Sequence, residues 1–88
     1  MNRENRLALA ESASLRREAF GALIYSYADR RLLFIDDQLL PFLASAGGRT
    51  VGEIADDLLS RGVMSETGLA RTLLVLDGLH QKGILNVL

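Results

Sequence analysis

The fold is decided by residues 16–37, which read RREAFGALIYSYADRRLLFIDD. Within this stretch, residues 22–27 and 31–35 are rich in aromatic, β-branched and other apolar side chains, and they are predicted as two strands. Ala28, Asp29 and Arg30 lie between them and favour a tight turn. Two strands with so short a connection form an antiparallel hairpin. Because an isolated hairpin is only marginally stable in water, the rest of the chain is expected to cover one face of it.

A third strand is predicted beside the hairpin at residues 14–18, and Gly21 is expected to supply a bend or bulge before the next strand. The alanine and serine content of residues 7–18 also permits a turn of helix, so this segment has two possible conformations. Residues 1–6 are polar and are predicted to be flexible. Residues 7–88 are predicted to form one domain, because a chain of 88 residues has no room for two cores.

After the hairpin, the apolar residues change to helical spacing. The residues that carry this spacing are Leu39, Leu40, Phe42 and Leu43. Asp36 and Asp37 are predicted to cap the first helix, since carboxylates favour a helix N-terminus. Pro41 then falls in the first turn, where its missing N–H does least harm. Gly47 and Gly48 are predicted to end the helix.

Two further helices have clear start and stop signals. Thr50 and Glu53 have the spacing of a capping box, and Gly62 ends the helix that follows. Ser65 is predicted to cap the third helix, which Gly83 ends. The apolar stripe of this third helix consists of Leu69, Leu73, Leu76 and Leu79, widened by Leu74 and Val75.

The order of these elements predicts an α+β domain with a winged-helix-like arrangement, a three-stranded antiparallel sheet followed by three helices. The helices are expected to pack on one face of the sheet. Residues 84–88 form a short apolar tail. Both a strand and a plug against the sheet are possible for this tail.

Composition excludes several classes of function. Ten basic and eleven acidic side chains give a net charge of −1, which indicates no general affinity for nucleic acid. The chain lacks cysteine and lacks an apolar stretch of signal-peptide or membrane-spanning length, so we expect a cytoplasmic protein with no membrane partner. The single histidine, His80, has no second histidine or cysteine with which to bind a metal. No catalytic constellation is visible, and we expect a protein that is neither an enzyme nor the holder of a cofactor.

A DNA-binding function is the alternative that the predicted helix-turn-helix offers, with the third helix as the recognition helix. Only Arg71 and Lys82 are firmly cationic there, and Glu66 and Asp77 oppose them. Several cationic contacts to phosphate normally dominate affinity for DNA. We therefore expect no nucleic-acid partner, and we retain this function as the second choice.

Peptide binding is the other possibility, because a small three-stranded sheet has two edges to which a further strand can be added. If residues 31–35 form an edge strand, an extended peptide can pair with it, and the leucine-rich third helix can form the other wall of a groove. Leu74 and Val75 could instead pack on residues 84–88, which would leave no such groove. A free edge could also pair with a second copy, so the protein is expected to be a monomer or an edge-paired dimer.

The motif Arg-x-Glu-x-Phe-Gly-Ala-Leu-x-Tyr occurs at residues 16–25. On this motif the chain resembles the small peptide chaperones of mycofactocin biosynthesis. These in turn resemble the pyrroloquinoline quinone chaperone and other precursor-peptide recognition domains. The resemblance extends over roughly residues 7 to 85. Ala19 and Ser26 depart from the family pattern, which is expected to have proline and histidine at these positions.

The resemblance implies a non-catalytic domain that holds the leader of a ribosomally made precursor peptide as an added strand. It further implies a radical S-adenosylmethionine (SAM) maturase as partner, which does the chemistry with its own iron–sulfur clusters. Carried onto this sequence, the pairing strand consists of Arg31, Leu32, Leu33, Phe34 and Ile35. The helical wall consists of Leu69, Thr72, Leu73 and Leu76.

Overall fold

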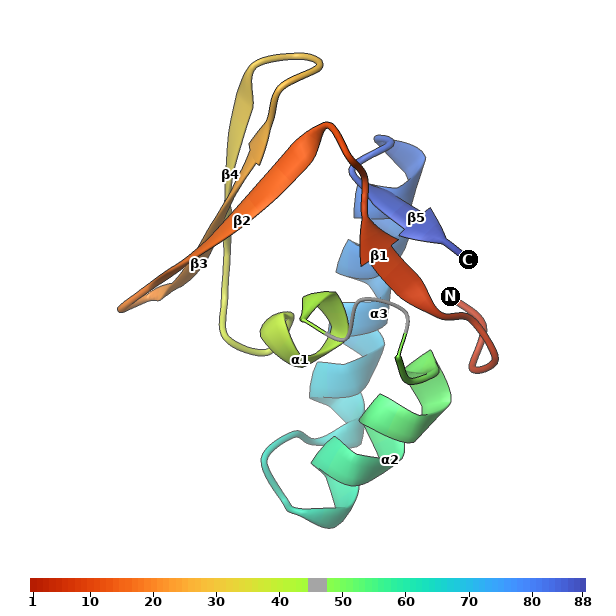
Figure 1. Ribbon diagram of the computed structural model, residues 1–88. Helices are drawn as coiled ribbons and strands as arrows, with labels where there is room; N and C mark the ends of the chain where they lie inside the picture. Colours follow the sequence, from red (N-terminus) through yellow and green to blue (C-terminus); the bar gives the residue numbers. More distant parts are fainter. Residues whose placement is uncertain (45–47) are drawn as a thin grey trace.

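The computed structural model describes residues 1–44 and 48–88. The elements in chain order are β1 (Leu7–Leu9), β2 (Ala13–Glu18), β3 (Gly21–Ser26), β4 (Arg31–Ile35), α1 (Leu40–Leu43), α2 (Val51–Ser60), α3 (Glu66–Gln81) and β5 (Leu85–Val87). A three-stranded sheet stands on one side of the molecule and the helices lie on the other (Figure 1). The α+β class predicted from the sequence is therefore confirmed.

The three-stranded sheet is antiparallel, with β3 in the centre and β2 and β4 at its edges. Its second hairpin turns at residues 27–30, and Arg30 adopts a positive φ of 55° there. The turn between β2 and β3 is formed by Ala19 and Phe20, and Gly21 follows with a φ of 144°. A Cβ atom on Gly21 would lie 2.3 Å from the carbonyl oxygen of Ile35, so the register of β3 on β4 depends on glycine at this position.

A second sheet was not predicted. The first and last strands, β1 and β5, pair antiparallel with Leu7 opposite Val87 and Leu9 opposite Leu85. The C-terminal tail is thus a strand, but its partner is β1 and not the three-stranded sheet. Three strands followed by three helices is accordingly an incomplete description, because β1 precedes the sheet and β5 follows α3. The winged-helix arrangement remains a prediction.

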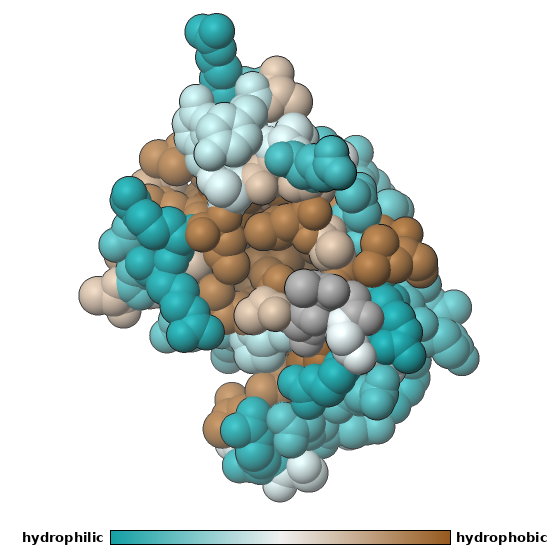
Figure 2. All heavy atoms as spheres, in the orientation of Figure 1, coloured by the Kyte–Doolittle hydropathy of each residue, from teal (hydrophilic) through white to brown (hydrophobic). Residues whose placement is uncertain are grey.

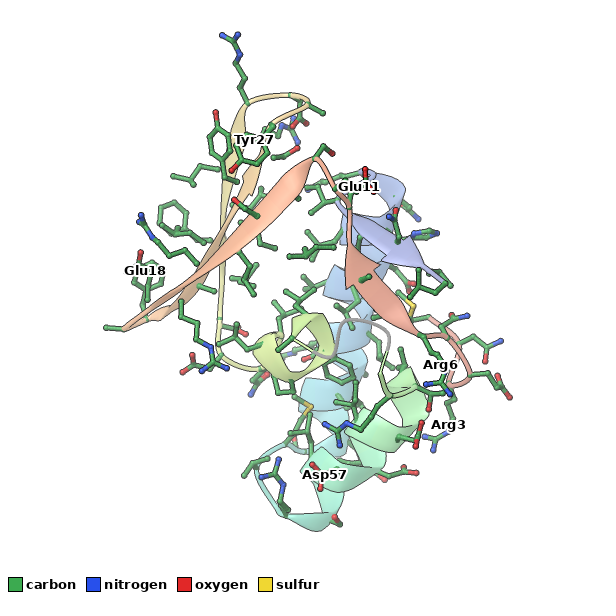
Figure 3. The ribbon with its side chains drawn as sticks, in the orientation of Figure 1. Arg3, Arg6, Glu11, Glu18, Tyr27 and Asp57 are labelled. Atoms are coloured by element: carbon green, nitrogen blue, oxygen red, sulfur yellow. The ribbon has the colours of Figure 1, made fainter. Side chains whose placement is uncertain are left out.

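Residues 1–6 lie beside α2, where Figure 3 shows the side chains of Arg3 and Arg6. The backbone N–H groups of Val51 and Gly52 donate hydrogen bonds to the carbonyl oxygens of Asn5 and Arg3, at 2.8 and 2.9 Å. A guanidinium nitrogen of Arg3 lies 2.7 Å from the Asp56 carboxylate. These contacts attach the N-terminal segment to the first turns of α2.

The core lies between the inner face of the three-stranded sheet and the helices. From the sheet it receives Ala22 and Ile24, both fully buried, and from α1 it receives the fully buried Phe42. Figure 2 shows apolar side chains lining the hollow between the sheet and β1. Leu76 of α3 and Leu85 of β5 are also fully buried, so strands from both sheets share one core with α3.

Most of the predicted helix termini are confirmed. The Thr50 hydroxyl accepts a hydrogen bond from the N–H of Glu53, and the Glu53 carboxylate accepts one from the N–H of Thr50. The Thr50 N–H, followed by the Thr50 hydroxyl, lowers the pKa of Glu53. The Ser65 hydroxyl caps α3 by accepting a hydrogen bond from the N–H of Gly68.

The first helix differs from its prediction. It is capped by Leu39 without a side-chain hydrogen bond, and the Asp36 carboxylate instead accepts one from the N–H of Gln38 in the preceding turn. The Asp36 carboxylate therefore shapes the connection after β4 and does not cap the helix. Pro41 lies in the first turn as predicted. The helix ends at Leu43 with Ala44 as its C-cap, before the glycine pair that was predicted to end it; Gly47 of that pair lies outside the described residues.

Candidate functional site

Both edge strands of the three-stranded sheet, β2 and β4, have one unpaired side in the described chain, and β4 is the more apolar of the two. Strand β4 pairs with β3 on one side, and among residues 1–44 and 48–88 no strand pairs with its other side. The side chains from Leu32 to Ile35 are all apolar. Proteins usually protect an exposed edge with charges, proline or a bulge, and the centre of β4 has none of these. This edge is therefore built in a way that permits another strand to pair with it.

The register of the sheet indicates which backbone groups of β4 point out of this edge. Opposite residues in an antiparallel pair alternate between hydrogen-bonded and non-hydrogen-bonded positions. The β2–β3 hairpin closes at Glu18 opposite Gly21, and beyond its other end the N–H of Tyr27 donates to the carbonyl of Ser12 at 2.7 Å. Odd-numbered residues of β3 therefore direct their backbone groups towards β2.

Even-numbered residues of β3 consequently direct their backbone groups towards β4. Their partners are Arg31, Leu33 and Ile35. The two remaining residues of β4, Leu32 and Phe34, thus direct their N–H and C=O groups out of the open edge. An added strand would form its hydrogen bonds with Leu32 and Phe34.

The side chains of β4 lie on two faces of the sheet. Ile35 is buried and Leu33 half-buried on the inner face, where both contact the core. Leu32 and Phe34 are on the outer face, 51% and 72% exposed. A strand paired with this edge would have an apolar neighbour on each face.

Helix α3 approaches the carboxyl end of β4 across a small cleft of about 140 Å³. One wall is formed by the segment that follows β4, and the other by one side of α3. The residues that line it are Asp36, Gln38, Leu39, Arg71, Thr72 and Val75. The cleft carries one charge of each sign, from Asp36 and Arg71, beside the apolar Leu39 and Val75.

The four predicted wall residues of α3 are distributed over the core stripe and one side of the helix. Leu76 is fully buried, and Thr72 is 4% exposed with its hydroxyl donating to the carbonyl oxygen of Gly68 at 2.9 Å. Leu69 and Leu73 are half-buried. They share a helix face with Asp77, whose carboxylate binds the amino group of Met1 at 2.9 Å. Of the four, Thr72 alone lines the cleft beside β4.

Sequence reasoning did not assign Arg71 and Val75 to the wall. They are four residues apart, so they lie on the same side of α3, where they line the cleft. This side is opposite Leu73, since Val75 lies roughly 160° from Leu73 around the helix axis. The periodicity of the leucines locates the core stripe but does not say which flank of the stripe faces the sheet. Leu74 and Val75 are 71% and 45% exposed and are not part of the core that contains Ile84 and Leu85, which does not support the alternative in which they pack on the C-terminal tail.

The described parts of the chain contain no candidate metal site and no membrane-spanning helix. No group of three histidine, aspartate or glutamate side chains is placed to bind a metal ion there. His80 lies with its Nδ1 atom 3.0 Å from the carbonyl oxygen of Leu85, a contact between α3 and β5. None of the helices described is both long and apolar enough to cross a membrane.

Comparison with known proteins gave one result. No significant match was found among curated proteins or among solved structures. The sequence model of the peptide chaperone MftB family matches residues 6–86. This match confirms the resemblance, which the sequence places over roughly residues 7 to 85, and it spans β1 to α3 and most of β5. The chain belongs to the peptide chaperone MftB family.

Proposed function

We propose that this peptide chaperone binds the leader of a ribosomally made precursor peptide as a fourth strand on β4. We further propose that it presents the bound peptide to a radical SAM maturase in the cytoplasm, as the resemblance to mycofactocin-type systems implies. The observation that carries the first proposal is the open edge of β4, with the backbone groups of Leu32 and Phe34 directed outwards.

The proposed site consists of two walls. Arg31–Ile35 is the pairing strand, in which Leu33 and Ile35 also anchor the edge to the core. Arg71, Thr72 and Val75 form the helical wall at the carboxyl end of this strand. Leu69, Leu73 and Leu76 support this wall by fixing α3 against the rest of the core.

The domain needs no chemistry of its own for this function. A leader held on β4 keeps the rest of the precursor near any enzyme that the chaperone binds. For a short flexible linkage, the effective concentration that results is on the order of millimolar. The iron–sulfur chemistry belongs to the proposed maturase, and the contribution of the chaperone is to bind and position the substrate.

An amide NMR titration with a synthetic leader peptide tests the binding mode. We expect the largest shifts at residues 31–36 and 71–75. Shifts concentrated along β2 would contradict pairing at β4. A concentration series of the free protein, recorded first, separates a monomer from an edge-paired dimer.

A duplex DNA titration on the same sample tests the alternative function. If the protein is a peptide chaperone only, the duplex produces no shifts at low salt. A winged-helix DNA-binding domain would instead show shifts along α3 that weaken steeply as salt rises, and Arg71→Ala would reduce them.

A further inference from the structure

The outer face of the three-stranded sheet is apolar although it does not contact the core. Its two rows of opposite residues are Ser14–Tyr25–Leu32 and Arg16–Leu23–Phe34. Each row has a polar residue on β2 and apolar residues on β3 and β4. The apolar surface of both rows therefore increases towards the open edge.

Phe34 is the most exposed large hydrophobic residue of the described chain, at 72%. Its ring has Phe20 on one side, with 5.7 Å between ring centroids. Leu23 lies opposite Phe34 on β3 and is only partly exposed, because it has neighbours on both sides. Among residues 1–44 and 48–88, no strand flanks Phe34 or Leu32 on the side of the open edge.

The ends of this face are closed by defined contacts. The Tyr27 hydroxyl lies 3.2 Å from the Ser14 hydroxyl, and its ring packs edge-to-face on Tyr25 with 4.8 Å between centroids. At the other end Arg16 forms an ion pair with Glu18 at 2.6 Å. Figure 3 shows Tyr27 and Glu18 at opposite ends of the sheet. These contacts close the two ends of the outer face, and the apolar rows stay open at the β4 edge.

The occupant of this boundary is defined by the backbone. Leu32 and Phe34 expose their side chains on the outer face and direct their backbone groups out of the edge. A strand that pairs with them places the side chains of the two directly opposite residues on the same face, about 5 Å away. The residue between those two faces inwards, beside Leu33 and the α3 cleft.

We propose that the outer face is a second specificity surface for the bound peptide. The preferred substrate is an extended segment with apolar residues at two positions separated by one residue. Those two side chains complete the outer rows by packing against Leu32 and Phe34. This inference rests on the proposed function and adds that the peptide is selected on both faces of the sheet and not in the α3 cleft alone.

A peptide array provides the test. The probes are synthetic decapeptides in which three consecutive central positions are varied independently among Phe, Leu, Thr and Lys. We expect the full-length protein to select Phe or Leu at the first and third of these positions. Replacing either by Thr, which keeps the strand propensity, should weaken binding by about tenfold.

Protein variants assign the preference to the outer face. Phe34→Ser should abolish the preference for an apolar residue at the peptide position that packs on Phe34 and leave the preference at the other outward position unchanged. The effects on binding of Phe34→Ser in the protein and of the apolar-to-Thr replacement at that peptide position should therefore be non-additive. Leu74→Ser is the matched control, because Leu74 is similarly exposed, at 71%, but belongs to α3 and to neither of the two outer rows of the sheet. This control should leave the preference at all three positions as in the parent protein.

Each outcome is decisive. Equal binding of Thr and Phe at the outward positions, or an equal loss on Phe34→Ser for every peptide, would overturn the two-face inference while peptide capture itself stood. Absence of binding to every peptide, in a protein shown by circular dichroism to be folded, would overturn the proposed function and this inference with it.

Discussion

At the scale of single residues, Gly21 controls the geometry of the proposed binding edge. Its φ of 144° is accessible to glycine and strained for other residues, and a Cβ atom there would meet the backbone of Ile35 and Asp36 on the neighbouring connection. The motif glycine is therefore required by close backbone approach. It holds β3 and β4 in the register that directs Leu32 and Phe34 outwards.

Gly21→Ala should accordingly lower the free energy of unfolding by at least about 2 kcal/mol, since strain and a backbone clash add together. Chemical denaturation measures this loss. Gly78→Ala in α3 is the matched control, because nothing lies within 4 Å of its Cβ position. The control should stabilise the protein by about 0.5–1 kcal/mol through helix propensity. Equal effects of the two substitutions would contradict the role given to Gly21.

Glu53 makes the stability of the N-terminus of α2 depend on pH. Its carboxylate accepts the hydrogen bond of the Thr50 N–H, and its pKa is lowered by this contact. A carboxyl whose pKa is lower in the folded state stabilises the fold above the unfolded pKa and loses this effect as the pH falls through the folded value.

We therefore expect the stability difference between the parent protein and Glu53→Gln to be largest above the ordinary glutamate pKa of about 4.3. This difference should decrease as the pH is lowered further. Urea denaturation at several pH values measures it. Asp56→Asn is a suitable control, because Asp56 lies on the exposed side of the same helix and forms one surface ion pair with Arg3. A difference that grew on acidification would contradict the assigned sign.

At the scale of elements, β4 is the strand on which the proposed function depends. Its residues alternate between those bonded to β3 and those directed outwards, so substitutions at neighbouring positions test different bonds. Leu33→Pro removes an N–H that bonds to β3 and should destabilise the sheet itself. Phe34→Pro removes an outward N–H, and edge strands tolerate proline on this side.

Phe34→Pro should consequently remain folded and bind a leader peptide roughly tenfold more weakly than Phe34→Ala, which lacks the same ring but retains the N–H. Isothermal titration calorimetry gives both affinities, and thermal unfolding verifies that both variants fold. Equal affinities would exclude strand addition at this edge. Comparison of the two variants separates the backbone bond from the aromatic contact.

At the scale of the whole molecule, the pairing of β1 with β5 connects the two ends of the chain. The N–H of Ala10 donates to the carbonyl of Ile84 at 2.9 Å, and that of Leu88 donates to Arg6 at 2.8 Å. Leu85, the first residue of β5, is fully buried. The pairing contributes to a single core that also contains α3, the helix that forms one wall of the proposed site.

Leu85→Ala should therefore lower the free energy of unfolding by about 2–5 kcal/mol, because it creates a cavity in this shared core. That is a large fraction of the roughly 5–15 kcal/mol typical of a domain. Leu88→Ala, at a residue that is 68% exposed, should change it by less than about 0.5 kcal/mol. Guanidinium denaturation measures both. A small loss for Leu85→Ala would mean that β5 is peripheral to the core.

Local signals in the sequence determined a large part of this protein. The hairpin, the capping box at Thr50, the cap at Ser65 and the stop at Gly83 depend on interactions between residues close in the chain, and each was predicted correctly. Asp36 was assigned to the wrong position for a related reason, since a carboxylate that favours a helix start equally favours the turn before it. The motif at residues 16–25 identified the family without reference to the fold.

Only the tertiary structure decided which strands meet and which flank of a helix faces them. The pairing of Leu7 with Val87 is not encoded in a local pattern, because strands of three residues carry little periodicity. Val75 and Arg71 were likewise indistinguishable from Leu69 and Leu73 as candidate wall residues until α3 was oriented against β4. Helical periodicity defines a stripe, whereas the packing of the whole core defines which side of that stripe borders the open edge.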